Sequence, residues 1–175
     1  MNAVSEIVQD LQTKFSGVPL EPQVTRDGIP TVWAPKERLW EILRDLKTEA
    51  PQPYRMLYDL CAVDERERTH RQGQTESDFT VIYHLLSFER NEDLRIKVAL
   101  KGEFPSIRTV TDLWPAANWY ERETWDMFGI GFAGHPDLRR ILLPEEFTAH
   151  PLRKDYPLQG RGERHNFPVI TRAEG

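Results

Sequence analysis

The most constraining feature of this sequence is its C-terminal stretch, in which prolines recur without helical or strand periodicity. Prolines stand at positions 136, 144, 151, 157 and 168, and a proline inside a helix or a central strand breaks its hydrogen bonding. A long connection without regular structure is unusual inside a compact monomer. The sequence therefore predicts a compact domain over residues 1–134 and an extended, partner-binding arm over residues 135–175.

The first 134 residues mix helical and strand patterns, which is typical of an α+β domain. The expected elements are a helix over 3–16, a hairpin of strands 23–26 and 29–33 around Asp27-Gly28, a helix over 36–49, a strand over 54–63, a hairpin of strands 79–88 and 94–100, and a helical stretch over 106–128 that Pro115 interrupts and Gly129 ends. This order predicts a two-layer sandwich in which helices cover one face of a mixed, mostly antiparallel sheet.

Charge is distributed unevenly along the chain, whose formal net charge is -5. Residues 1–137 hold 16 basic and 23 acidic side chains, whereas residues 138–172 hold 7 basic and 4 acidic ones. A basic arm suits nucleic acid, anionic lipid or an acidic protein groove. Nucleic acid is disfavoured because acidic residues interrupt the arm and the body beneath it is acidic.

The apolar and cysteine content restricts the environment. No run approaches the roughly 20 apolar residues that a membrane-spanning helix requires. Glu6, Asp10 and Lys14 interrupt the N-terminal segment, so no secretory signal is expected there. A single cysteine, Cys61, forms no internal disulfide and by itself holds neither zinc nor an iron–sulfur cluster. A reducing, cytoplasmic compartment is the expectation.

Nucleotide and metal motifs give no functional prediction. Residues 129–134 read G-x-G-x-x-G, but a dinucleotide loop needs a strand before the glycines and a helix after them. Here a helix leads in and His135-Pro136 leads out, so we expect a helix cap followed by a flexible turn. The five histidines show no pair at metal-ligand spacing. Neither a cofactor nor a metal is therefore expected in this chain.

Two arrangements leave catalysis open as an alternative. Cys61 and His84 lie on neighbouring predicted strands, although the apolar neighbours of Cys61 favour an inert core thiol. The run from 118 to 128 mixes carboxylates with large aromatic residues. Helical spacing places Glu123 on an aromatic face, where it needs an arginine partner, and places Arg122 four residues before Asp126 for an ion pair. We favour structural ion pairing at an interface.

These residues carry a resemblance to a known family. The spaced pattern is Glu121-Arg122-Glu123, Asp126-Met127-Phe128, His135 and Arg139-Arg140, followed by the block HPLRKDYPL over 150–158. Together they resemble the signature of the 30-kDa subunit of respiratory complex I, which is the C-type subunit of bacterial NADH-quinone oxidoreductase. The resemblance extends over about residues 35–158.

The resemblance implies a scaffold subunit in the peripheral arm of a proton-translocating NADH:quinone oxidoreductase, on the cytoplasmic side of the inner (plasma) membrane. It implies that FMN and iron–sulfur clusters reside in partner subunits and that this chain holds no redox cofactor. The implied partners are other peripheral-arm subunits, especially those near the quinone end of the cluster chain, and the membrane is reached only through the complex. The implied interface with other subunits includes Glu121, Arg122, Glu123, Asp126, His135, Arg139, Arg140, His150, Arg153, Lys154 and Asp155.

Two alternatives remain open from the sequence. The same kind of subunit serves related assemblies, such as a membrane-bound hydrogenase or a ferredoxin-plastoquinone reductase. A more distant alternative is a free-standing acid/base or thiol enzyme that uses Glu121, Glu123 or Cys61, and an enclosed cleft holding those groups would distinguish it.

Overall fold

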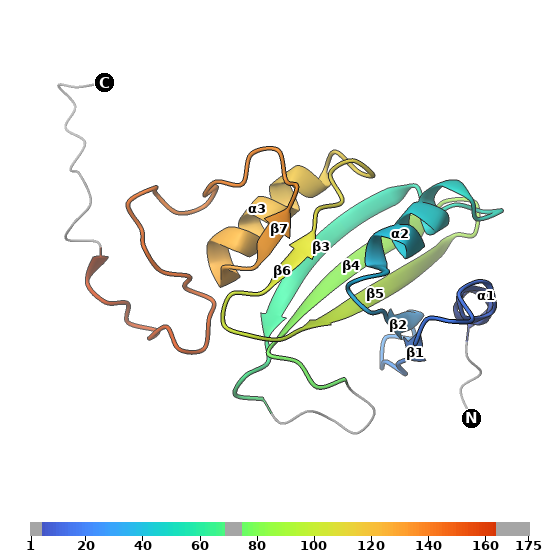
Figure 1. Ribbon diagram of the computed structural model, residues 1–175, viewed down its shortest axis with the longest axis horizontal. Coiled ribbons are helices and arrows are strands. Elements are labelled where there is room, and N and C mark those ends of the chain that lie inside the picture. Colours follow the sequence, from blue (N-terminus) through green and yellow to red (C-terminus); the bar gives the residue numbers. More distant parts are fainter. Residues whose placement is uncertain (1–4, 69–74, 164–175) are drawn as a thin grey trace.

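The computed structural model describes residues 5–68 and 75–163. In chain order its elements are α1 (Glu6–Lys14), β1 (Glu21–Pro22), β2 (Thr31–Trp33), α2 (Leu39–Thr48), β3 (Met56–Asp64), β4 (Phe79–Ser87), β5 (Glu92–Leu100), β6 (Ser106–Arg108), α3 (Ala117–Phe128) and β7 (Gly131–Ala133). The main sheet has the strand order β1-β2-β5-β4-β3, and β6 pairs with β7 separately (Figure 1).

The sheet is mixed and mostly antiparallel. Only the β2–β5 pair is parallel among the pairs of the main sheet in the described chain. In the central pair, Val81 lies opposite Val98 and Tyr83 opposite Ile96, and all four side chains are fully buried. The apolar faces of α1, α2 and α3 join these residues in one core. The predicted α+β sandwich with helices on one face is therefore confirmed.

The opposite side of the same strands is less buried. We call it the open face and define it by Cys61, Ile82, His84, Arg95 and Lys97, which are all half-buried and alternate with core residues along β3, β4 and β5. A period of two residues gives each strand one core side and one open side.

Several predicted boundaries need correction. The stretch over 106–128 begins with strand β6 rather than a helix, and the helix itself starts at Ala117, after Pro115. The first hairpin pairs Glu21–Pro22 with Thr31–Trp33, so its first strand lies earlier than predicted and its connection is longer. The prediction failed there because a two-residue turn signal was taken to set the strand ends.

The glycine-rich segment after α3 is also more ordered than predicted. Gly129 ends the helix in the left-handed conformation, as expected. The next residues are not a flexible turn, because Gly131–Ala133 forms β7 and pairs in parallel with β6. After β7, described residues 134–163 run in turns and bends alongside α3 (Figure 1). None of the helices in the described residues is long and apolar enough to cross a membrane.

Candidate functional site

The C-terminal end of α3 forms the centre of the site because the arm packs against it. Gly129 has φ 73°, and a Cβ atom there would lie 2.7 Å from Cδ2 and Nε2 of His150. Only glycine both adopts this conformation without strain and leaves room for the imidazole. The His150 Nδ1 atom lies 3.0 Å from the Asp126 carbonyl oxygen. The helix end is therefore shaped to hold residue 150 of the arm.

Asp126 anchors the arm through its backbone. Its Oδ2 atom accepts hydrogen bonds from the amides of Ile141, Leu142 and Leu143 at 3.1, 2.9 and 3.0 Å, and Arg140 Nη1 donates to Oδ1 at 2.5 Å. Burial alone would raise the pKa of this fully buried carboxyl, but these donors together lower it below its ordinary value. Asp126 is thus a buried carboxylate whose charge organises four groups of the arm.

Two arginines complete the contact between α3 and the arm. Arg140 also donates from Nη2 to the Ala149 carbonyl at 3.0 Å, which ties two parts of the arm together. Arg122 donates to the carbonyls of Arg139 and Arg140 at 3.1 and 2.9 Å. The predicted Arg122–Asp126 pair along the helix is wrong, because each side chain instead bonds to the arm.

Arg153 is a buried cation that caps the helix. Its Nε atom donates to the Phe128 carbonyl at 2.6 Å and its Nη2 atom to the Glu103 carbonyl at 2.5 Å. The guanidinium also lies over the rings of Phe79 and Phe104, with 5.3 and 4.8 Å to their centroids. A cation at the C-terminus of a helix is favoured by the helix dipole. Burial and neighbouring Arg66 lower the pKa of Arg153.

A second ionic cluster joins the arm to the end of β3. Arg66 pairs with Asp64 at 2.5 Å and with Asp155 at 3.1 Å, and the Lys154 amide donates to Asp64 at 2.8 Å. The Lys154 residue itself is exposed. Asp64 and Arg66 were not among the residues that the sequence predicted for the site. Their signal was the acidic residue that ends an otherwise apolar strand.

The other side of α3 buries Glu121 against the body. Thr109 donates from Oγ1 at 2.5 Å and the Val110 amide at 2.7 Å, while His135 Nε2 lies 3.9 Å from Oε2. Burial outweighs these donors and raises the pKa of Glu121 to about 7. The negative charge of Glu121 adds to burial in raising the pKa of Tyr83.

The predicted environment of Glu123 is wrong. Glu123 is exposed, whereas Glu121 is 0% exposed. Helical spacing placed Glu123 on an aromatic side of the helix, but it did not say which side meets the body. Trp119, which shares the predicted face of Glu123, is 61% exposed. The helix therefore buries the Glu121 side and presents the Trp119 and Glu123 side to the outside.

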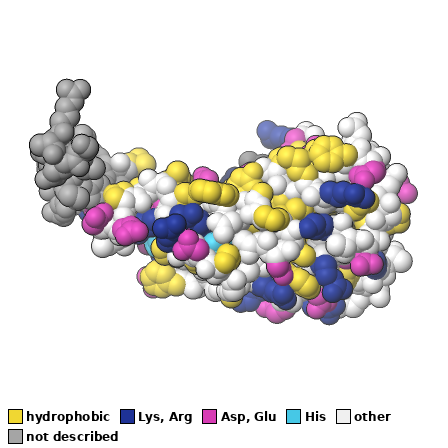
Figure 2. All heavy atoms as spheres, turned by 90° about the horizontal axis from the view of Figure 1, so that it is seen from above, with side chains coloured by type: hydrophobic (Ala, Val, Ile, Leu, Met, Phe, Trp, Pro, Cys, Tyr) yellow, Lys and Arg dark blue, Asp and Glu magenta, His cyan; other side chains and the backbone are white. Residues whose placement is uncertain are grey.

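The outer surface of the arm is rich in large apolar side chains. Leu142, Leu152 and Leu158 are 60%, 53% and 108% exposed. Arg139 is also exposed, and its side chain pairs with exposed Asp137 at 2.9 Å. At the end of the molecule that carries the arm, Figure 2 shows basic, acidic and hydrophobic side chains close together. A contiguous patch of exposed apolar side chains is typical of a surface that contacts another protein.

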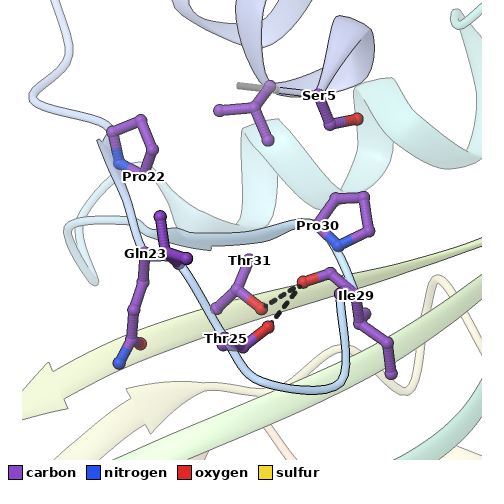
Figure 3. Close-up of a pocket in the computed structure, with 10 residues that line it drawn as sticks. Ser5, Pro22, Gln23, Thr25, Ile29, Pro30 and Thr31 are labelled. Carbon is purple, nitrogen blue, oxygen red and sulfur yellow. Dashed lines mark hydrogen bonds between the residues drawn. The ribbon is translucent and has the colours of Figure 1, made fainter. Parts of the chain in front are cut away.

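A pocket of about 320 Å³ lies apart from this surface, between α1 and the β1–β2 connection. Figure 3 shows that its lining combines prolines with uncharged polar residues. The hydroxyls of Thr25 and Thr31 both donate to the Ile29 carbonyl, at 3.1 and 2.9 Å, so they stabilise the turn. Potential metal ligands gather elsewhere, on the open face, where Asp59, Cys61 and His84 approach one another.

The fold and the site together define a class of protein: a small α+β subunit whose arm is fixed on a helix of its own body and presents apolar side chains outward. Residues 32–162 match the family described as "Respiratory-chain NADH dehydrogenase, 30 Kd subunit". The chain belongs to that family.

Similar proteins agree with this assignment. The chain is 52% identical to the C/D-type subunit of NADH-quinone oxidoreductase from Nitrosospira multiformis, over 97% of this chain and 29% of that protein. It is 55% identical to the C/D-type subunit from Psychrobacter arcticus, over 87% of this chain and 26% of that one. The chain thus spans between a quarter and a third of the length of these curated relatives.

Two solved structures share the fold. A trypsin-resistant fragment (1–134) of Nqo5 superposes with a TM-score of 0.61 at 31% identity, covering 75% of this chain and 96% of that one. A chain of the membrane-bound sulfane sulfur reductase, an archaeal respiratory membrane complex, superposes with a TM-score of 0.69 at 24% identity, covering 95% and 92%. The second likeness concerns the fold alone.

Proposed function

We propose that this chain is a scaffold in the peripheral arm of a proton-translocating NADH:quinone oxidoreductase, on the cytoplasmic side of the membrane. The assembly transfers electrons from NADH through FMN and iron–sulfur centres to a quinone. Those centres are held by partner subunits, and this chain contributes no flavin, cluster or catalytic centre to the reaction. It associates with the membrane only through the complex.

The observation that carries this proposal is the construction of the arm. Buried side chains of α3 hold the arm by its backbone, as Asp126 does with three consecutive amides. The arm's own apolar side chains, Leu142 and Leu152 among them, are left exposed. A segment fixed in this way has lost its conformational entropy before any partner arrives, which favours tight docking.

The partner surface is defined by what remains exposed. It consists of the large apolar side chains Trp119, Leu142, Leu152 and Leu158, with Glu123, Arg139 and Lys154 at its margins. Arg140 and Arg153 support this surface indirectly. The Arg140 guanidinium pairs with Asp126 and the Arg153 guanidinium donates to the Phe128 carbonyl, both inside the chain. The C/D in the relatives' name joins two subunit types in one protein, and we infer that a D-type portion is the first partner of this surface.

The alternatives receive less support. The relatives at 52–55% identity carry the NADH-quinone oxidoreductase name, which favours that complex over a hydrogenase or a plastoquinone reductase. Burial and then the charge of Asp59 raise the pKa of Cys61 to about 11, which disfavours a thiolate nucleophile. Glu121 lies against Thr109 and Val110 inside the body, rather than in a cleft beside Glu123.

The test is affinity purification of the tagged chain from gently solubilised native membranes. Mass spectrometry should find a D-type partner with flavin and iron–sulfur subunits, and the eluate should oxidise NADH with a quinone. The double variant Leu142→Asp, Leu152→Asp should lower the recovered partner by about tenfold or more, because charged groups would be buried at the interface.

Phe88→Asp is the matched control, because Phe88 is 65% exposed and lies at the β4–β5 turn, away from the arm. It should leave the recovered complex unchanged. Equal recovery with the double variant would reject the proposed surface. A wild-type chain that elutes alone would reject the scaffold function itself and favour a free-standing enzyme.

A further inference from the structure

Three side chains with metal-binding atoms meet on the open face of the sheet, far along the chain from the arm. Asp59 and Cys61 project from the same side of β3, and His84 on β4 lies directly opposite Asp59 in the register. One carboxylate oxygen, the Sγ atom and one imidazole nitrogen all lie within 4.8 Å of one another. Antiparallel pairing thus creates a ligand set that no local spacing in the sequence displays.

A β-bulge shapes this cluster. The register shifts between Leu57 and Asp59, and consecutive residues Tyr58 and Asp59 are both half-buried beside His84. The Tyr58 hydroxyl lies 3.5 Å from His84 Nδ1, and the two rings are tilted with centroids 5.6 Å apart. Bulges are enriched beside functional sites because they redirect side chains, and a partner on one ring nitrogen orients a ligating imidazole.

The charges around the cluster favour a cation. The negative charge of Asp59 is felt at both Cys61 and His84. The charge of Glu123 is felt at Cys61, and those of Asp27 and Asp93 at His84. Positive charge on this face comes from Arg95, which Asp27 already pairs at 2.7 Å, and from Lys97, which lies opposite Ile82 in the register. Four carboxylates therefore stand against two cations, and a bound divalent ion would balance the excess.

We propose that Asp59, Cys61 and His84 form a binding site for a single Zn²⁺ ion, with solvent at the remaining position. One sulfur, one nitrogen and one carboxylate oxygen make a ligand set of the borderline-soft type that zinc prefers. Ligand atoms around tetrahedral zinc lie roughly 3.3–3.8 Å apart. Side-chain rotations that move the ligand atoms by about 1 Å therefore bring them to zinc-binding distance. Zinc has no redox chemistry, so the site is independent of the electron-transfer function proposed above.

The experiment is a Co²⁺ titration of the full, reduced, tag-free chain, followed by competition with Zn²⁺. Because Cys61 is the only cysteine, a thiolate-to-cobalt charge-transfer band reports this site alone. Cys61→Ser should abolish the band. His84→Ala and Asp59→Asn should each weaken Zn²⁺ binding by about 100-fold, and Tyr58→Phe by about tenfold, since outer partners matter less than ligands.

Glu41→Gln is the matched control, because Glu41 is an exposed carboxylate on α2, against the other face of the sheet. It should bind both metals like the wild type. Circular dichroism and thermal melting without metal identify any variant that fails to fold, and the ligand variants that do fold then decide the question. No charge-transfer band at one equivalent of Co²⁺, or unchanged Zn²⁺ affinity in folded His84→Ala and Asp59→Asn, would overturn the proposal.

Discussion

Helix α3 buries one carboxylate on each of two sides, and the pKa values of the two groups shift in opposite directions. Asp126 faces the arm, where three amides and Arg140 surround it and its pKa falls. Glu121 faces the body, where two donors do not offset burial and its pKa rises to about 7. Neither side chain has exposed surface, but Glu121 lies deeper inside the body, whereas Asp126 has more donors and a guanidinium beside it.

The difference shows how each region is stabilised. On the body side, α3 contributes Ala117, Met127 and Phe128 to an apolar core, and Glu121 is accommodated as a largely neutral group below pH 7. On the arm side, order depends on charge-assisted hydrogen bonds to the backbone, which are stronger than neutral ones. Removing a charge should therefore harm the arm side and spare, or even help, the body side.

The largest effect is expected for Arg140→Ala. This substitution leaves Asp126 buried without its cation, and breaking a buried pair typically costs about 3–5 kcal/mol. The arm should open from α3, and cleavage by trypsin at the arm should accelerate by more than about 100-fold. Limited proteolysis with mass spectrometry of the fragments measures this rate.

Arg139→Ala is the control for that variant, since Arg139 is adjacent in sequence but exposed. Exposed pairs contribute about 0–1 kcal/mol, so its digestion at the remaining sites should match that of the wild type. Equal acceleration by both variants would mean that the Asp126–Arg140 pair does not hold the arm.

Glu121→Gln is expected to have a smaller effect than Arg140→Ala, and to stabilise the protein instead of destabilising it. The folded pKa of Glu121, about 7, lies above the ordinary value of 4.5, so the folded state binds the proton more tightly than the unfolded state. Stability is therefore highest below pH 4.5 for this group and is lost as the pH rises through about 7, by up to roughly 3 kcal/mol. Glu121→Gln should remove this loss.

Urea unfolding of wild type and Glu121→Gln between pH 5 and pH 8 measures the difference in the free energy of unfolding. The two proteins should diverge as the pH rises, with the variant more stable at pH 8. Asp126 acts in the other direction, because its lowered pKa makes its contribution fade only as the pH falls below 3.8. Parallel curves for wild type and Glu121→Gln would contradict the assignment of Glu121 as the group with a pKa of about 7.

The smallest effect concerns the helix end. Gly129→Ala forces a side chain into a left-handed conformation, which costs about 1–2 kcal/mol, and also into contact with His150. Gly28→Ala is the control, because Gly28 has φ 74° with nothing within 4 Å of the new Cβ. Gly129→Ala should lower the free energy of unfolding by more than Gly28→Ala does. If both cost the same, the close approach of His150 is not tight in solution.

The main sheet was predictable because its information is local. Alternation along 79–88 and 94–100 indicated β4 and β5, and their hairpin sets the core face through a period of two residues. Strands β6 and β7 were missed because each is only three residues long and they pair with each other across α3. Such short segments carry no period of their own.

The contacts of the site were less predictable than its residues. Asp126 and Arg140 were both singled out, yet their pairing across 14 positions depends on how the arm turns back. Helical geometry alone favoured the nearer pair Arg122–Asp126, and it gave Glu123 rather than Glu121 the buried side. Side chains that bond to distant backbone groups leave no regular pattern in a sequence. The role of the eleven residues at an interface with other subunits stays a prediction.

The most direct measurement is amide hydrogen exchange of Ile141, Leu142 and Leu143 in the isolated full chain. All three amides donate to Asp126, and the account holds that α3 orders the arm before any partner binds. Their exchange should be at least about 100-fold slower than in an unstructured peptide, and this protection should disappear in Asp126→Ala. Exchange at the unstructured rate in the wild-type chain would contradict the account.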